Sequence, residues 1–291
     1  MSIERVFIVG AGLMGHGIAQ VSAAAGKQVT LADRTPELAN QGKSRIAGNL
    51  ARQVEKGRIE RTAADATLGR VTTAAGVDGV GGHDLVIEAV FEDEALKRET
   101  WAAIAARADP ATIFATNTSS ISITSLATAT DRPARFIGLH FFSPVQVMRL
   151  LEIIRGLETD DATCSAARGF AEQLGKEVIK SKDYPGFIVN RMLVPFINEA
   201  IRALMEGLGT REDIDQGARL GLHHPMGPLE LADFVGLDTH LYICGVLYEG
   251  LHDAQFAAPP LLRQLVDAGH FGRKSGRGFY RYGPDGNRVP D

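Results

Sequence analysis

Hydrophobic positions in the first half of the chain form short continuous runs separated by stretches with helical spacing. The continuous runs predict buried strands and lie at residues 5–9, 29–32, 84–90, 112–116 and 135–142. Residues 18–25 have helical spacing until Gly26 interrupts it, and a polar helical stretch at about 37–56 follows Pro36. Strands that alternate with helices predict an open, doubly wound sheet with helices on both faces, which is a Rossmann-like α/β fold.

The pattern changes beyond residue 150. Apolar runs at 151–154 and 177–180 predict the last two strands, and a helical pattern at about 162–174 lies between them. Helical periodicity then continues through nearly all of the remaining sequence. We therefore expect two domains, a Rossmann-like domain at residues 1–184 and an all-helical domain at 185–291.

Composition and charge exclude several classes of protein. Hydrophobic residues form 45% of the chain and charged residues 23%, which is typical of a globular protein and unlike a disordered one. The net charge of −4 gives no positive field that would attract nucleic acid. The sequence shows no signal peptide and no apolar stretch of about 18 residues, so we expect a cytoplasmic protein without a membrane partner. Cys164 and Cys244 lie far apart, and no Cys/His cluster has ligand spacing, so we expect no metal.

The turn after the first predicted strand has the glycine pattern of a dinucleotide-binding site. In G-x-G-x-x-G the first glycine permits a tight turn, the second lets a pyrophosphate approach the backbone, and the third lets helix and strand pack closely. The start of the following helix offers unpaired N–H groups to the phosphates. The residues of this turn, which we expect to bind NAD, are Gly10, Ala11, Gly12, Leu13, Met14 and Gly15.

Asp33 ends the next predicted strand, 23 residues after Gly10. A carboxylate at this place is suited to hydrogen-bond the adenosine ribose and disfavours a 2′-phosphate, which favours NAD over NADP. The neighbouring Arg34 leaves NADP open, because its guanidinium either covers the adenine or receives a phosphate. The structural alternative is a plain glycine turn followed by an exposed loop acid.

A histidine and a glutamate form the candidate acid/base pair. His140 lies near the end of one apolar strand, and Glu152 lies twelve residues later inside another. Pro144 between them can turn the chain, so that the strands neighbour each other and the two side chains come within hydrogen-bonding reach. A buried carboxylate fixes the tautomer of an imidazole and stabilises the imidazolium, which NAD-dependent alcohol oxidation requires of its base. The structural alternative is a core histidine paired with a glutamate.

Two further polar segments are of interest. Residues 117–120, Asn-Thr-Ser-Ser, follow a predicted strand and lie at the carboxyl edge of the sheet, where ligands of doubly wound folds bind. Taken alone, they are better interpreted as a cap of the following helix. Asn190 lies early in the first long helix of the second domain, where its amide either faces the cleft between the domains or is solvated.

Motifs along nearly the whole chain carry a family resemblance, and they lie at residues 10–15, 117–120, 138–145, 185–191, 224–229 and 272–280. They resemble those of the short-chain L-3-hydroxyacyl-CoA dehydrogenases, and most closely the bacterial 3-hydroxybutyryl-CoA dehydrogenases. The resemblance implies reversible, NAD-dependent oxidation of an L-3-hydroxyacyl-CoA of short chain length. It also implies an active site between the two domains and a homodimer formed through the helical domain.

The resemblance implies roles for individual residues as well. His140 is the expected catalytic acid/base and Glu152 its orienting partner, while Ser119 and Asn190 are expected to hold the hydroxyl or carbonyl of the substrate. Lys56 falls where the family meets CoA. Without the resemblance, Lys56, Lys97 and Lys274 are each better interpreted as solvated surface lysines. Besides the glycine turn, the positions expected to contact NAD are Asp33, Glu92, Lys97, Ser119, Ser143 and Lys274.

Other interpretations stay open at this stage. Ser143 stands where many stand-alone members have asparagine, so its detailed contact is expected to differ. A dehydrogenase of the same architecture that acts on a free hydroxy acid or sugar acid is one rival. A binding protein that keeps the NAD site without turnover is another, although the intact His140 and Glu152 argue against it. The sequence leaves open the acyl-chain length, the direction of the reaction and the pathway that it serves. Fatty-acid β-oxidation is one of the candidate pathways.

Overall fold

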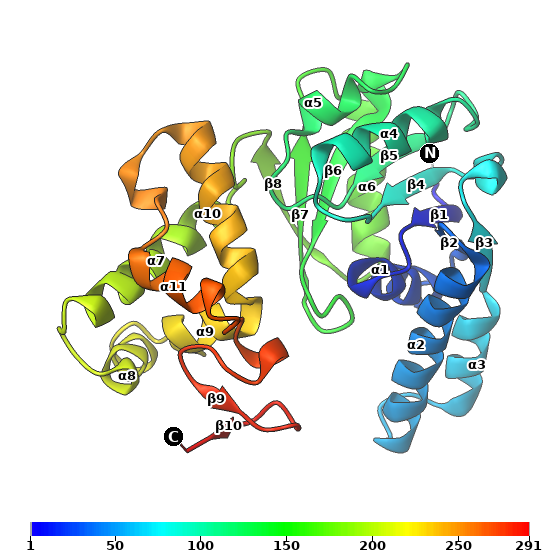
Figure 1. Cartoon of the computed structure of the whole chain (residues 1–291). Helices are drawn as coiled ribbons and strands as arrows, with labels where there is room; N and C mark the ends of the chain where they lie inside the picture. Colours follow the sequence, from blue (N-terminus) through cyan, green and yellow to red (C-terminus); the bar gives the residue numbers. More distant parts are fainter. Residues whose placement is uncertain (1, 291) are drawn as a thin grey trace. The chain divides into compact units, whose positions relative to one another are not determined.

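The structure is a computed structural model that describes residues 2–290. It divides into two units, of which unit 1 ends at Tyr184 and unit 2 begins at Pro185 (Figure 1). Unit 1 is built on an eight-stranded sheet, and unit 2 is mostly helical. Among the described residues, no helix is both long enough and apolar enough to cross a membrane.

The strand order of unit 1 creates a ligand-binding edge. The order is β3-β2-β1-β4-β5-β6-β7-β8, in which β7 runs antiparallel to β6 and every other neighbouring pair is parallel. The order reverses between β1 and β4, and ligands of such sheets bind outside the carboxyl ends of the strands at this point. The strands are β1 (Arg5–Val9), β2 (Gln28–Asp33), β3 (Val71–Ala75), β4 (Leu85–Glu88), β5 (Ile113–Thr116), β6 (Phe136–Phe141), β7 (Leu150–Arg155) and β8 (Glu177–Lys182).

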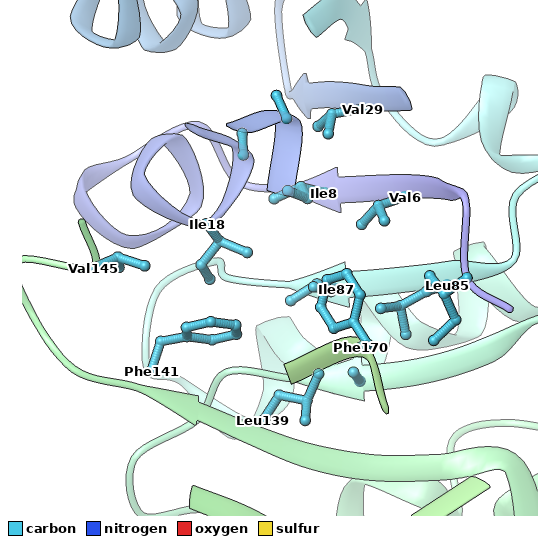
Figure 2. Packing of buried hydrophobic residues seen from close by; sticks show 14 of the residues in the cluster. Val6, Ile8, Ile18, Val29, Leu85, Ile87, Leu139, Phe141, Val145 and Phe170 are labelled. Atoms are coloured by element: carbon cyan, nitrogen blue, oxygen red, sulfur yellow. The ribbon is translucent and has the colours of Figure 1, made fainter. Parts of the chain in front are cut away.

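Helices cover both faces of this sheet. On one face, Ile18 of α1 and Phe170 of α6 belong to the same buried apolar cluster as Ile87 of β4 (Figure 2). On the other face, the ring of Trp101 in α4 packs against Phe114 of β5. The helices are α1 (Leu13–Ala24), α2 (Pro36–Glu55), α3 (Arg61–Gly69), α4 (Glu94–Ala105), α5 (Ile123–Ala127) and α6 (Asp161–Gln173), with short 3-10 helices η1 (Asp78–Val80) and η2 (Pro133–Arg135).

The prediction of a Rossmann-like sheet followed by a helical region is confirmed. The hydrophobic pattern predicts neither α3 nor β3, however. β3 reads Val-Thr-Thr-Ala-Ala, and Val71 is its one buried residue. Because β3 is an edge strand, it lacks the continuous apolar run of a strand buried on both faces.

Unit 2 packs its helices around a separate apolar core, which includes Ile197, Leu229 and Leu247. It also contains a short antiparallel pair of strands near the end of the chain. The expectation of an all-helical domain is therefore wrong in this one detail. The elements are α7 (Val189–Met205), α8 (Arg211–Gly221), α9 (Pro228–Val235), α10 (Leu237–Leu251), η3 (Ala254–Phe256), α11 (Pro260–Asp267), η4 (Arg273–Ser275), β9 (Arg281–Tyr282) and β10 (Arg288–Val289).

A buried carboxylate anchors this last segment of unit 2. Asp233 accepts the backbone N–H groups of Phe279 and Tyr280 and the hydroxyl of Tyr282, each at 2.9 Å. Burial raises the pKa of Asp233 to about 6, although these hydrogen bonds favour the ionised form. The contacts hold the chain that follows η4 against α9.

Candidate active site

The glycine turn joins β1 to α1. Gly10 has a φ of +100°, and a Cβ on it would lie 2.5 Å from the carbonyl oxygen of Ala89. A Cβ on Gly15 would overlap the carbonyl oxygen of Gly10. At Gly12, by contrast, nothing lies within 4 Å of the Cβ position, so a ligand has room to approach the backbone there. Because α1 begins without a side-chain cap or an acidic residue in its first turn, its positive end suits a phosphate.

Asp33 lies beside this turn. Its Oδ2 accepts the N–H of Ala11 at 2.8 Å, and its Oδ1 accepts the N–H of Arg34 at 2.7 Å. Asp33 is the half-buried last residue of β2, so the alternative of an exposed loop acid is wrong. An open glycine, a positive helix end and a fixed carboxylate together fit the pyrophosphate and the ribose of NAD.

His140 and Glu152 lie opposite each other on paired strands. The antiparallel register of β6 and β7 places the two residues directly across from one another. His140 Nδ1 lies 2.7 Å from Glu152 Oε2. Both side chains are buried, Glu152 completely. This contact assigns the Nδ1 proton to the bond with the carboxylate, so Nε2 is the nitrogen that can exchange a proton with a substrate.

The loop after β5 is organised around Glu92. Glu92 Oε1 accepts the hydroxyl of Thr118 at 2.6 Å and the backbone N–H of Ser119 at 2.7 Å. The hydroxyls of Ser119 and Ser120 lie 3.1 and 3.2 Å from the same oxygen. Although burial opposes ionisation, the Lys97 ammonium and these hydrogen bonds hold the pKa of Glu92 below its usual value. Ser119, a predicted substrate and cofactor residue, is therefore fixed by an ionised carboxylate.

The interpretation of residues 117–120 as a helix cap is wrong. Ser122 caps α5 instead, because its hydroxyl accepts the N–H of Ser125 at 3.1 Å. Asn117 Oδ1 accepts the N–H of Phe141 at 3.0 Å, which ties the loop to the residue after His140. The loop therefore lies beside the candidate acid/base pair for a structural reason that the sequence does not show.

Lys97 is buried rather than solvated. Its Nζ lies 2.6 Å from Glu88 Oε1 and 3.3 Å from Glu92 Oε2, and it is 1% exposed. The alternative of a solvated surface lysine is therefore wrong at this position. Glu88, which ends β4 and is fully buried, is not among the residues predicted for the site. An acidic residue inside a buried apolar run is a signal for it, because such a charge requires a partner.

The remaining predicted site residues lie in both units. In unit 1, Lys56 follows α2 and Ser143 lies in the loop between β6 and β7, and both are exposed. In unit 2, Asn190 lies in the first turn of α7 and is buried, so a solvated amide is excluded. Lys274 Nζ forms an ion pair with Asp238 Oδ1 at 2.6 Å.

Comparison with known proteins gives one consistent family. Residues 5–184 match the 3-hydroxyacyl-CoA dehydrogenase NAD binding domain, and residues 186–282 match the C-terminal domain of the same family. A 3-hydroxybutyryl-CoA dehydrogenase of Bradyrhizobium diazoefficiens is 52% identical over 280 residues, which cover 96% of each chain. The mitochondrial hydroxyacyl-coenzyme A dehydrogenase of Homo sapiens is 43% identical and covers 96% of this chain and 91% of its own.

Solved structures of similar proteins point to the same family. The crystal structure of FadB2 from M. tuberculosis superposes with a TM-score of 0.95 at 45% identity, over 97% of this chain and all of that one. The (S)-3-hydroxybutyryl-CoA dehydrogenase PaaH1 from Ralstonia eutropha has a TM-score of 0.93 with the same identity and coverage. The matched domains span both units of the structure. The chain therefore belongs to the 3-hydroxyacyl-CoA dehydrogenase family, and its first unit is the NAD-binding domain.

Proposed function

We propose that this chain catalyses the reversible, NAD-dependent oxidation of an L-3-hydroxyacyl-CoA to the 3-oxoacyl-CoA, with short-chain substrates such as 3-hydroxybutyryl-CoA. The observation that carries the proposal is the 2.7 Å contact between His140 Nδ1 and the buried Glu152 Oε2. A histidine oriented by a carboxylate is suited to take and return a hydroxyl proton. The names of relatives that are 45–52% identical support the substrate.

His140 and Glu152 carry the proton chemistry in this mechanism. His140 Nε2 accepts the proton of the C3 hydroxyl as the carbonyl forms. Glu152 holds the Nδ1 proton, and its negative charge stabilises the imidazolium that results. NAD⁺, when bound at the glycine turn, supplies the acceptor for the C3 hydride. In the reverse direction the imidazolium returns its proton to the carbonyl oxygen.

Other residues are assigned to binding. Ser119 and Asn190 hold the substrate oxygen, and Lys56 contacts the CoA moiety. Asp33 contacts the adenosine ribose of NAD. The further cofactor contacts in this assignment are the glycine turn together with Glu92, Lys97, Ser119, Ser143 and Lys274.

We also propose a cytoplasmic homodimer that forms through unit 2, residues 185–291, which also binds the substrate. The large exposed apolar side chains of this unit, including Met192, Leu208 and Leu220, support such an interface. Light scattering after size exclusion tests the dimer, and a monomer at micromolar concentration would contradict it.

The test of the reaction is NADH consumption with acetoacetyl-CoA, followed by absorbance. NADPH and free acetoacetate are parallel controls. We expect turnover with the thioester and NADH together. Turnover with free acetoacetate in place of the thioester would instead indicate a dehydrogenase of free hydroxy acids. NADH binding without any turnover would indicate a binding protein.

A further inference from the structure

A cavity of about 440 Å³ lies within unit 2 and is lined by residues of α7, α8, α11 and the segment 277–281. Its volume is in the range of sites that hold small organic molecules. Part of its wall is apolar and is formed by Leu204 of α7 and by Leu261 and Leu265 of α11. None of its lining residues is among those assigned above to NAD, CoA or the reaction, so the cavity is a separate feature of the molecule.

The polar part of the wall is basic. Arg211, Arg277, Arg281 and His270 line the cavity, and in the part of the chain that the structure describes no acidic side chain does so. Arg211 is already engaged, because its Nη1 donates to the carbonyl oxygen of Phe279 at 2.7 Å. The side chains of Arg277 and Arg281, by contrast, form no hydrogen bond or ion pair with another described residue. These two guanidiniums are therefore left for a ligand.

Arg277 and Arg281 lie directly across from each other in the backbone. An isolated antiparallel bridge pairs them, and the N–H groups of Gly278 and Tyr282 form the hydrogen bonds that flank the bridge, at 2.8 and 2.9 Å. The two arginines are thus a non-hydrogen-bonded pair, in which the side chains lie on the same side and close together. Like charges in this arrangement repel each other. An anion between the two guanidiniums would offset this repulsion.

The backbone that carries this pair is held in place. Asp233 accepts the N–H groups of Phe279 and Tyr280, which lie between the two arginines in the sequence. A Cβ on Gly278 would overlap Asp233 Oδ1, so the chain approaches this carboxylate closely. Because both guanidiniums start from a fixed backbone, an anion that binds them loses little free energy in ordering the site.

We propose that this cavity of unit 2 binds a carboxylate that carries an apolar chain, such as a free medium-chain fatty acid. The carboxylate lies between Arg277 and Arg281, because guanidinium N–H groups match its two oxygens. The chain lies against Leu204, Leu261 and Leu265 and removes their apolar surface from water. Inorganic phosphate would match the charge but would leave this apolar wall uncovered. The inference does not depend on the proposed reaction, since the two sites share no residue.

Calorimetric titration of the full chain with octanoate tests the inference. We expect saturable binding to the wild type. Arg277→Gln and Arg281→Gln should each weaken it about tenfold, because each removes one charged donor. Arg277→Gln/Arg281→Gln should abolish it. Both arginines are exposed, so these variants are expected to fold. The matched control is Arg263→Gln, because Arg263 is exposed on α11 and does not line the cavity, and we expect it to bind octanoate as the wild type does.

Related ligands test the two halves of the site separately. From butanoate through hexanoate to octanoate, the affinity should rise about threefold for each added methylene group that the apolar wall covers. Octanamide keeps the chain without the charge, so it should bind at least about tenfold more weakly than octanoate. An affinity that does not change with chain length would overturn the inference, and so would inorganic phosphate that binds as tightly as octanoate.

Thermal unfolding without ligand separates binding from a structural role. Because the two guanidiniums repel each other in the empty cavity, Arg281→Gln should unfold about 1 °C above the wild type. A lowered midpoint would instead show that the arginines hold the fold, which contradicts the inference. Equal octanoate binding in the wild type and Arg277→Gln/Arg281→Gln would place the ligand elsewhere and overturn it. Absence of binding to the wild type would overturn it as well, and a shift of the double variant toward monomer would then identify a second copy of the chain as the occupant.

Discussion

Each unit buries a histidine beside a polar partner, but the two partners differ. In unit 1, His140 meets the carboxylate of Glu152, which is within 2.7 Å on the neighbouring strand. In unit 2, His240 Nε2 lies 3.0 Å from the amide oxygen of Asn198 and 3.7 Å from the thiol of Cys244. A carboxylate can stabilise a charged imidazole, whereas an amide and a thiol in an apolar core cannot.

The surroundings of His240 indicate a structural role. Burial lowers the pKa of His240 to about 4 and raises the pKa of Cys244 to about 11, so both are neutral at physiological pH. Asn198 also donates to the carbonyl oxygens of Gln255 and Ala257, which joins α7 to the segment around η3. The comparison shows that burial of a histidine alone does not distinguish the candidate acid/base from a structural histidine, whereas the charge of its partner does.

The largest expected effect is that of His140→Gln. Glutamine keeps a polar side chain of similar reach but cannot exchange a proton, so kcat falls about 10³-fold. NADH affinity, measured by fluorescence titration, stays within about twofold of the wild type because the glycine turn is unchanged. A kcat near that of the wild type would remove His140 from the mechanism.

Glu152→Gln is expected to have the next largest effect. The amide preserves volume and one hydrogen bond to Nδ1, but it removes the charge that stabilises the imidazolium, so kcat falls about 10²-fold. Steady-state kinetics with acetoacetyl-CoA checks this, and a thermal unfolding curve controls for the buried substitution. If the variant kept more than about a third of the wild-type kcat, Glu152 would be a structural partner in the way that Asn198 is.

The same comparison predicts a pH dependence of stability for unit 2. Because the pKa of His240 is lowered, the unfolded chain binds more protons between pH 4 and pH 6.5, and the free energy of unfolding falls as the pH is lowered through this range. His240 alone makes the protein about 2 kcal/mol less stable at pH 5 than at pH 7.

His240→Gln removes this contribution, which denaturant unfolding at the two pH values measures. Asp233, whose raised pKa acts in the opposite sense, is present in both proteins and cancels in the difference. The matched control is His224→Gln, because His224 is exposed and stacks on Phe196 in the same unit. An equal pH dependence in the wild type and His240→Gln would contradict a buried neutral histidine.

The smallest expected effect concerns the reactivity of Cys244. Its thiol is fully buried and its pKa is raised to about 11, so a reagent that reacts with thiolates does not modify it in the native protein at pH 8. Mass spectrometry after labelling should locate the reagent on Cys244 only in denaturant. Modification under native conditions at the rate of an exposed thiol would show that the His240 cluster opens to solvent.

The sequence predicts the strands that are buried on both faces and the helical character of unit 2, but it misses the edge strand β3. The strand pairing of His140 with Glu152 follows from two apolar runs and an intervening Pro144, because adjacent runs joined by a turn pair as neighbours. The edge strand β3 is not predicted because its two threonines interrupt the apolar pattern. Contacts that depend on the conformation of a loop are also not predicted from the sequence. Nothing in the spacing of Glu88, Glu92 and Lys97 indicates that the three charges meet, because the conformation of the loop between β4 and α4 determines their positions.

The ladder between β6 and β7 has a consequence for how freely the loop between them can vary. Main-chain hydrogen bonds of the two strands align His140 with Glu152, so the loop that joins them takes no part in the alignment. Loops of different length or sequence, with other side chains at the position of Ser143, can be carried by the same strand pair. Insertions are tolerated in such connections more readily than in strands. The orientation of the candidate acid/base pair is thereby inherited with the sheet, while the loop between the two strands remains free to change.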